Sequence, residues 1–203
     1  MFWGPVEEFI PLSKIPARLA SLRGVLTPEK IEARHRIEIP RPSYPYATHI
    51  AVVEIDPQTG ALTIPRYAVA HDCGKLINPL LVEGQIVGGV VQGIGAVLRE
   101  QLVYDKDGIL QTRALMDYVL PGASDAPAEF KLWHMETPTS FNPFGMRGIG
   151  EGGTIGAHAA MANALADALR DFDVAVDGSG PFTPIWIMDA LSRPARPAKS
   201  DKV

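Results

Sequence analysis

Residues 48–70 read THIAVVEIDPQTGALTIPRYAVA, in which two apolar segments flank a polar stretch. The segments 48–55 and 62–70 are rich in β-branched residues, as is typical of strands. The stretch between them, DPQTG at 56–60, has the residue types that favour a tight turn. The sequence therefore predicts a β-hairpin at the start of the folded region.

A helix is predicted after this hairpin, over 79–100, and it is unusually rich in glycine. Glycine costs about 1 kcal/mol relative to alanine at an interior helix position, so these residues need a reason. Gly89 and Gly93 lie four residues apart on one helical face, as do Gly84 and Gly88. Either pair lets another backbone or a bulky ligand approach closely, so that tight helix packing and ligand binding are both open.

The rest of the chain adds shorter elements to this core. A second hairpin is predicted around the turn at 105–108, with strands at 101–104 and 109–112. Later elements are strands at 129–136 and around Val174, an alanine-rich helix over 155–170 and a short helix over 184–191. The alanine-rich helix is expected to turn inward Ile155, Ala159, Ala162, Leu165, Ala166 and Leu169. The predicted fold is α+β, with β-hairpins packed against a glycine-rich helix and an alanine-rich helix.

The chain is expected to divide into three regions. Residues 1–45 are predicted to form an extended arm, because frequent prolines break any long element there. Residues 46–192 form the folded domain, and residues 193–203 form a loose tail. No uninterrupted apolar run reaches about 18 residues, so no membrane span is predicted. The first residues lack the features of a secretory signal, so a cytoplasmic location is expected.

Composition narrows the functional classes. Hydrophobic residues make up 46% of the 203 residues, which is too many for a disordered chain. The net charge of −4 leaves no basic excess to neutralise phosphates, which argues against nucleic acid as a partner. The single cysteine, Cys73, excludes a disulfide framework and a multi-thiolate zinc site, and a lone cysteine is more often buried than reactive. The five histidines show no metal-ligand spacing, so isolated histidines and no metal site are expected.

Glu151 is the strongest candidate for chemistry. It lies in GIGEGG at 148–153, directly before the alanine-rich helix. Glycines on both sides let the backbone approach a ligand and leave the carboxylate as the only polar side chain there. The alternative is an acid placed at a helix N-terminus by the helix dipole, worth about 0.3–1 kcal/mol, and local spacing does not decide between the two.

Gln92 is an amide on an otherwise apolar, glycine-rich helix. Such a residue is either a satisfied core amide or a hydrogen-bonding contact to a ligand. Gln85 lies seven residues earlier, on the same face. Neither a phosphate-binding P-loop nor a serine-hydrolase elbow occurs anywhere in the sequence.

Four groups of residues stand in a characteristic order along the chain. They are YATHIAVVEID at 46–56, HDCG at 71–74 with INP at 77–79, EGQIVGGVVQGIG at 83–95, and NPFGMRGIGEGGTIG at 142–156. Together they resemble the C-terminal part of the molybdenum-binding large subunit of the xanthine dehydrogenase and aldehyde oxidase family. The likeness is closer to its bacterial aerobic carbon monoxide dehydrogenase-like branch, and it covers about residues 32–191.

This resemblance implies a molybdenum hydroxylase, an oxidoreductase that places water-derived oxygen on an aldehyde, an N-heterocycle or a similar small molecule. Glu151 matches the family's active-site base, which takes a proton from a molybdenum-bound hydroxyl. The positions implied in cofactor binding are Gln92, Gly93, Gly148, Ile149 and Gly150. The implied cofactor is molybdenum-molybdopterin in its cytosine dinucleotide form. Iron–sulfur clusters and FAD are expected only on partner subunits, because a chain with one cysteine cannot ligate a cluster.

The chain departs from the family pattern in length and at one residue. Family large subunits are several times longer, so the expected partners are the missing N-terminal portion, an iron–sulfur subunit and a flavin subunit. Activity is not expected without that portion. Arg147 stands where related sequences often carry lysine, which keeps the charge. Three interpretations remain: a piece of a split hydroxylase, a non-catalytic module that binds family subunits, or a truncated product.

Overall fold

A computed structural model describes residue 36 and residues 41–176 and 180–193. The helices and strands of these described residues belong to the unit Arg41–Val203. In chain order they are β1 (Tyr46–Ile55), β2 (Leu62–Asp72), α2 (Pro79–Leu98), η2 (Ala123–Asp125), β3 (Glu129–Met135), α3 (Gly152–Ala168), η3 (Arg170–Phe172) and α4 (Pro184–Ser192). The arm predicted for 1–45 and the tail predicted for 193–203 lie almost entirely outside the described residues.

The predicted hairpin is confirmed. β1 and β2 pair antiparallel, from Tyr46 opposite Asp72 to Ile55 opposite Leu62. Asp56 holds the turn, because its Oδ1 accepts a hydrogen bond from the Gln58 backbone at 2.8 Å. The polar stretch between the two strands thus makes the turn that its composition predicts.

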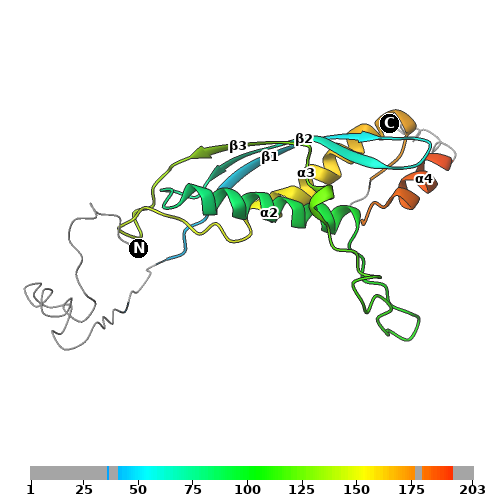
Figure 1. Cartoon of the computed structure of the whole chain (residues 1–203), viewed down its shortest axis with the longest axis horizontal. Coiled ribbons are helices and arrows are strands. Elements are labelled where there is room, and N and C mark those ends of the chain that lie inside the picture. Colours follow the sequence, from blue (N-terminus) through cyan, green and yellow to red (C-terminus); the bar gives the residue numbers. More distant parts are fainter. Residues whose placement is uncertain (1–35, 37–40, 177–179, 194–203) are drawn as a thin grey trace, which may run out of the picture. The chain divides into compact units, whose positions relative to one another are not determined.

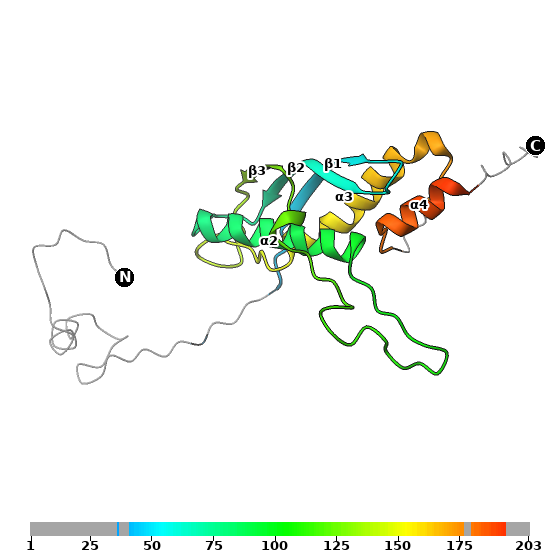
Figure 2. The same cartoon turned by 45° about the vertical axis from the view of Figure 1, so that its right-hand side comes forward.

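β3 completes a three-stranded sheet in the order β1-β2-β3, and it runs parallel to β2. A parallel neighbour needs a crossover, which α2 and the loop after it provide. The glycine-rich and alanine-rich helices are both confirmed, and α2 and α3 lie along one face of the sheet (Figures 1 and 2). The α+β prediction is therefore correct.

Two predicted strand regions are wrong. The segments 101–104 and 109–112 do make the expected turn, but only Tyr104 and Leu110 form a β-bridge. A short strand pair with no third strand or packed face is marginal in water, and this segment extends away from the helices (Figure 2). Residues 174–176 have no strand structure. Val174 and Val176 instead pack as partly buried side chains against the core.

Helix α2 begins at Pro79, where the Asn78 side chain accepts a hydrogen bond from Leu81 N at 3.2 Å. By length and composition α2 could cross a membrane, since its most apolar window has a mean hydropathy of 1.5. Core helices of soluble proteins meet the same criterion, and a third of that window is buried here. Its inner residues, including Ile86, Val90 and Ile94, belong to the hydrophobic core.

Glycines in both helices, Gly89 and Gly93 in α2 and Gly153 in α3, let α2 and α3 pack against each other. A Cβ on Gly93 would lie 2.6 Å from the Cβ of Ala157, and a Cβ on Gly153 would collide with the carbonyl oxygen of Ile86. By contrast, no atom lies within 4 Å of the position that a Cβ on Gly84 or Gly88 would take. Of the two faces left open by the sequence, one is used for helix packing and the other is free.

The buried stripe of α3 matches the predicted one only in part, with Leu165 and Leu169 buried as expected. Its buried residues are Gly153, Thr154, Ala157, Met161 and Leu165. Ile155 is 74% exposed, and Ala159 is exposed as well. The contact with α2 decides the orientation of α3, because only its small residues allow the two backbones to approach.

Candidate functional site

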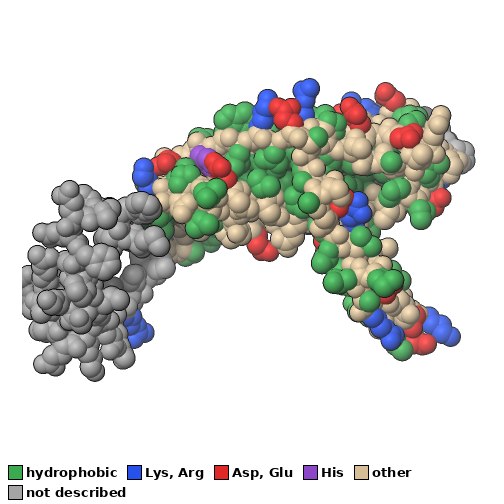
Figure 3. Space-filling model, in the orientation of Figure 1, with side chains coloured by type: hydrophobic (Ala, Val, Ile, Leu, Met, Phe, Trp, Pro, Cys, Tyr) green, Lys and Arg blue, Asp and Glu red, His purple; other side chains and the backbone are tan. Residues whose placement is uncertain are grey.

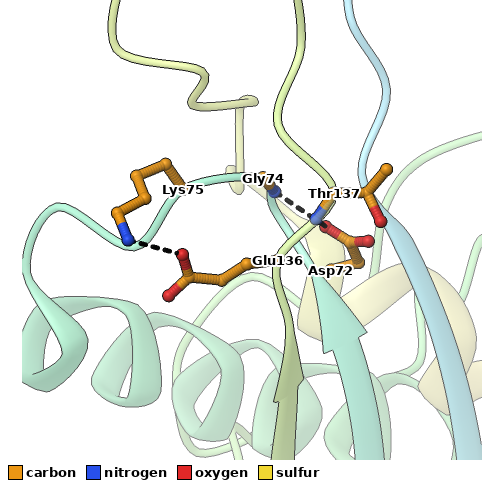
Figure 4. Close-up of polar contacts among 5 residues, drawn as sticks. All are labelled: Asp72, Gly74, Lys75, Glu136 and Thr137. Carbon is orange, nitrogen blue, oxygen red and sulfur yellow. Dashed lines mark hydrogen bonds and ion pairs between the residues drawn. The ribbon is translucent and has the colours of Figure 1, made fainter.

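The loop before α3 is held by the end of β2. Gly74 and Met146 form an antiparallel bridge, and Arg147 N donates to the Cys73 carbonyl at 2.7 Å. Asp72 supports the same region, since its Oδ1 accepts from Gly74 N at 2.8 Å and from Thr137 N at 3.1 Å (Figure 4). These contacts join segments that are distant in the sequence into one hydrogen-bonded support for residues 145–151.

Asp72 is 5% exposed and lies at the centre of this support. Burial raises the pKa of its carboxyl, but hydrogen bonds from Thr137 and Gly74 and the charge of Arg147 outweigh burial, so that the pKa lies below its ordinary value. Beside it, Lys75 Nζ pairs with Glu136 Oε2 at 2.9 Å (Figure 4). Asp72 therefore acts as an ionised acceptor that joins two loops.

We expect Asp72→Ala to lower the free energy of unfolding by about 1–3 kcal/mol, because two backbone donors lose their acceptor. Urea denaturation of the purified chain measures this. Asp107→Ala, in an exposed turn, is the matched control and should stay within about 0.5 kcal/mol of the wild type. An equal effect of the two substitutions would contradict the anchoring role of Asp72.

Arg147 fastens the loop to the start of β1. Its Nη1 donates to the Tyr44 carbonyl at 2.9 Å, and its Nε donates to the Thr137 carbonyl at 3.0 Å. The guanidinium also lies 5.3 Å from the ring centroid of Tyr46, which is a cation–π distance. The charge at this position thus has a structural role, which the sequence did not indicate.

Glu151 occupies the N-cap of α3 and is exposed. Its side chain makes no capping hydrogen bond to the helix. The structure therefore places an acid at the N-terminus of α3, as the helix-dipole alternative predicts, but without a side-chain capping hydrogen bond. The preceding residue, Gly150, has a φ of +31°, a conformation that residues with a side chain rarely adopt.

Two glutamines of α2 reach this turn. Gln85 Nε2 donates to the Gly150 carbonyl at 2.8 Å. The Thr154 hydroxyl lies 3.2 Å from Gln92 Oε1 and 3.0 Å from the Gly89 carbonyl. Because Gln92 is exposed, one end of its amide meets Thr154 and the other faces outward. The structure thus brings Gln92 into contact with Thr154, in the first turn of the helix that Glu151 precedes.

The other predicted cofactor-binding residues have different surroundings. Gly93 lies in the contact between the two helices. Ile149 is partly buried and packs against the core, so that only its backbone is available to a ligand. Gly148 and Gly150 are exposed, with no atom within 4 Å of the position that a Cβ would take. Accessible backbone and an exposed carboxylate therefore occur together at residues 148–151.

Three of the histidines are not isolated, contrary to the prediction. His49, His71 and His134 lie on adjacent strands, and His71 is directly opposite His134. The pairing of strands decides this neighbourhood, which spacing along the sequence does not reveal. Among the described residues, no group of three or more His, Cys, Asp or Glu side chains is placed to hold a metal ion. Cys73 is 4% exposed and burial raises the pKa of its thiol, as expected of an unreactive cysteine.

Several known proteins share much of this sequence. A family model described as "Molybdopterin cofactor-binding domain" matches residues 20–127. The nicotine 6-hydroxylase large subunit of Paenarthrobacter nicotinovorans is 46% identical over 132 residues, which are 65% of this chain and 16% of that protein. The carbon monoxide dehydrogenase large chain of Hydrogenophaga pseudoflava is 36% identical over 144 residues, covering 71% of this chain and 18% of that one.

Solved structures agree with these matches. The crystal structure of quinoline 2-oxidoreductase from Pseudomonas putida 86 superposes with a TM-score of 0.68 at 42% identity, covering 72% of this chain and 18% of that one. The chain thus spans 16% of the length of the curated relative with 46% identity. The family match includes α2 with Gln92 and ends before Glu151.

Proposed function

This chain belongs to the molybdopterin cofactor-binding domain family, and we propose that it is the C-terminal piece of a molybdenum hydroxylase large subunit. In this proposal it supplies the catalytic base and part of the cofactor site. The remaining contacts come from the N-terminal portion of the subunit, which this chain does not contain. Iron–sulfur and flavin subunits carry the electrons away, and the assembly works in the cytoplasm.

The observation that carries the proposal is the uncommitted carboxylate of Glu151. It is exposed, it makes no capping hydrogen bond, and it follows a turn whose glycines leave the backbone open. The support under this turn is centred on Asp72, which accepts hydrogen bonds from two loops. A carboxylate placed in this way is suited to accept a proton from a bound group in a defined position.

The residues present fit a molybdopterin. Its pterin is rich in hydrogen-bonding groups, and the outward end of the Gln92 amide meets that requirement. The backbone at Gly148 and Gly150 is accessible, as is the open face at Gly88 on the same side of α2 as Gln85 and Gln92. Gly93 supports the site indirectly by letting α2 approach α3.

Each residue then has a definite task in hydroxylation. A bound molybdenum cofactor supplies the two-electron redox chemistry of the reaction. Glu151 accepts a proton at a carboxylate oxygen, which makes the water-derived oxygen nucleophilic. Gln85 holds the Gly150 carbonyl and so keeps the residue before Glu151 in place. Gln92 orients the pterin through the free end of its amide.

The exposed surface is consistent with a missing neighbour. Large apolar side chains on the outer face of the sheet are open to solvent: Tyr46, Ile50, Val52, Trp133 and Met135. Apolar side chains also follow the segment 101–120, which projects from the folded unit (Figure 3). Patches of this kind usually mark surfaces that are covered in an assembly. The proposed covering is the rest of the large subunit.

The substrate class is an electron-poor small molecule, an aldehyde or an N-heterocycle. A relative named for the hydroxylation of nicotine favours the heterocycle. A second candidate function is a non-catalytic assembly module that keeps the fold and binds other subunits, which the exposed apolar side chains also favour. The two differ in whether molybdenum is bound.

The test is the amount of molybdenum per chain, by elemental mass spectrometry, on the complex isolated from its own source. We expect about one molybdenum per chain, with larger subunits co-purifying. Gln92→Ala should lower the molybdenum content about 10-fold, since it removes a cofactor contact worth about 1.4 kcal/mol. Gln101→Ala, at an exposed position outside α2, is the matched control. A complex without molybdenum would establish the assembly module instead.

A further inference from the structure

Three histidines from three different strands point to the same face of the sheet. His71 in β2 is opposite His134 in β3, and His49 in β1 is opposite Val69, two residues before His71. Since side chains alternate along a strand, all three rings lie on the face of the fully buried Val69, which α2 and α3 cover. His71 is 1% exposed.

The rings of two of these histidines lie directly under the residues that follow Glu151. A Cβ on Gly152 would lie 2.7 Å from His71 Nε2, and a Cβ on Gly156 would lie 2.6 Å from His49 Nε2. The first turn of α3 therefore rests on the imidazoles, and glycine is required where the contact is made. A displacement of either ring toward α3 would therefore meet backbone at the start of that helix.

The ring nitrogens are almost all without hydrogen-bond partners. Within the described residues, no partner is present for His49 Nε2 or for either nitrogen of His71 and His134. Only His49 Nδ1 has one, the Tyr67 hydroxyl at 3.0 Å. Protonation would add a second N–H donor to each ring and a positive charge in a buried place, and both are costly.

The groups around His49 and His71 offer little to offset such a charge. From α2, Glu83 Oε1 lies 3.5 Å from His134 Nε2, and its side chain is half exposed. Burial lowers the pKa of His71, and the charges of His134 and His49 lower it further, against the smaller opposing effect of Asp72. Burial also lowers the pKa of His49, and its interaction with the Gly152 backbone offsets only part of this. The hydroxyl of Tyr67 stays protonated, because burial raises its pKa. In the turn itself, the acidic residue is Glu151, which directly precedes Gly152 in the sequence.

We propose that His49 and His71 are positioning residues that must stay neutral to seat the Gly148–Gly153 turn, and that their protonation releases the turn and the Glu151 it carries. The structural half of this inference stands on the contacts above. Its link to catalysis rests on the proposed function of Glu151.

The sign of the pH effect follows from linkage. The unfolded chain protonates His49 and His71 near the ordinary histidine pKa of 6.5, whereas the folded chain protonates these two residues at lower pH. Stability is therefore complete above about pH 6.5 and is lost as the pH falls below it. The equilibrium constant for opening of the turn should rise up to about tenfold per pH unit for each of the two histidines that stays neutral while the turn is closed.

Hydrogen–deuterium exchange of the purified chain, analysed by mass spectrometry, tests the release of the turn. Between pH 7.5 and 5.5, protection factors in peptides covering 148–157 should fall at least about tenfold, while those in the β1–β2 turn should change far less. In His71→Asn, protection of peptides 148–157 should change much less between these two pH values, because asparagine does not take up a proton in this range. His158→Gln is the matched control, because His158 is an exposed histidine of the same helix and should behave as the wild type does.

Three results would overturn the inference. They are an equal fall in protection across the whole chain, an unchanged fall in His71→Asn, or the same loss of the effect in His158→Gln. If His71→Asn does not fold, imidazole NMR titration of the wild type decides: midpoints of 6.5 or above for His49 and His71 would also overturn it. The hydroxylation rate of the assembled enzyme should also fall at low pH. If the turn opens but this rate does not change with pH, the role of Glu151 is refuted and not the release of the turn.

Discussion

Glu151→Gln in the assembled enzyme should lower the hydroxylation rate about 10²–10⁴-fold and leave molybdenum bound. The amide has nearly the size of the carboxylate but cannot accept a proton at neutral pH, so that only the base is lost. Because the Glu151 side chain makes no capping hydrogen bond, the fold should be unaffected. Single-turnover kinetics and elemental analysis on the same preparation measure the two halves of this expectation.

Glu129→Gln is the matched control for this experiment. Glu129 is an exposed glutamate at the start of β3, paired with Lys131 and Arg66 and distant along the strand from His134. Its substitution changes the same chemical group and should leave the rate within about a factor of two, since surface pairs contribute little. Retention of a tenth or more of the wild-type rate by Glu151→Gln would rule out Glu151 as the base.

Gly153→Ala should lower the free energy of unfolding by about 1–3 kcal/mol. The added Cβ would collide with the backbone carbonyl of Ile86, which cannot move aside as a side chain can. Helix α3 would have to withdraw from α2, and the contact between Thr154 and Gln92 would lengthen. Urea denaturation measures the loss in stability.

Gly84→Ala, in helix α2, should change the free energy of unfolding in the opposite direction. No atom lies within 4 Å of its Cβ position, so alanine should stabilise the chain by about 0.5–1 kcal/mol through helix propensity alone. The two glycine substitutions should therefore differ in sign. Destabilisation by both, or by neither, would show that the close approach of α2 and α3 is not what distinguishes these positions.

The candidate site could be predicted only in part. Glu151 and Gln92 stand out in the sequence because each is a polar residue among glycines and apolar residues. Asp72 and Arg147 do not, since an acid after a strand and a base in a loop are ordinary on a surface. Their roles come from contacts with residues that are distant in the sequence, such as Thr137, Gly74 and Tyr44.

What the sequence by itself determined is local. The turn at 56–60, the start of α2 at Asn78 and the glycines around Glu151 each depend on residues within a few positions of one another. Turn and capping preferences act over this range, so these features follow directly from neighbouring residue types. The family resemblance rests on the same kind of information, short segments in order.

Only the tertiary structure decided which segments meet. The hydrogen bonds from Gln85 to Gly150, from Thr137 to Asp72 and from Thr154 to Gly89 each join residues 65 positions apart. The parallel pairing of β3 with β2 likewise brings His134 to His71. Such contacts arise from the burial of one face of each element and the register that it selects. No local preference specifies this register, and therefore only the fold could reveal the histidine cluster beneath the turn.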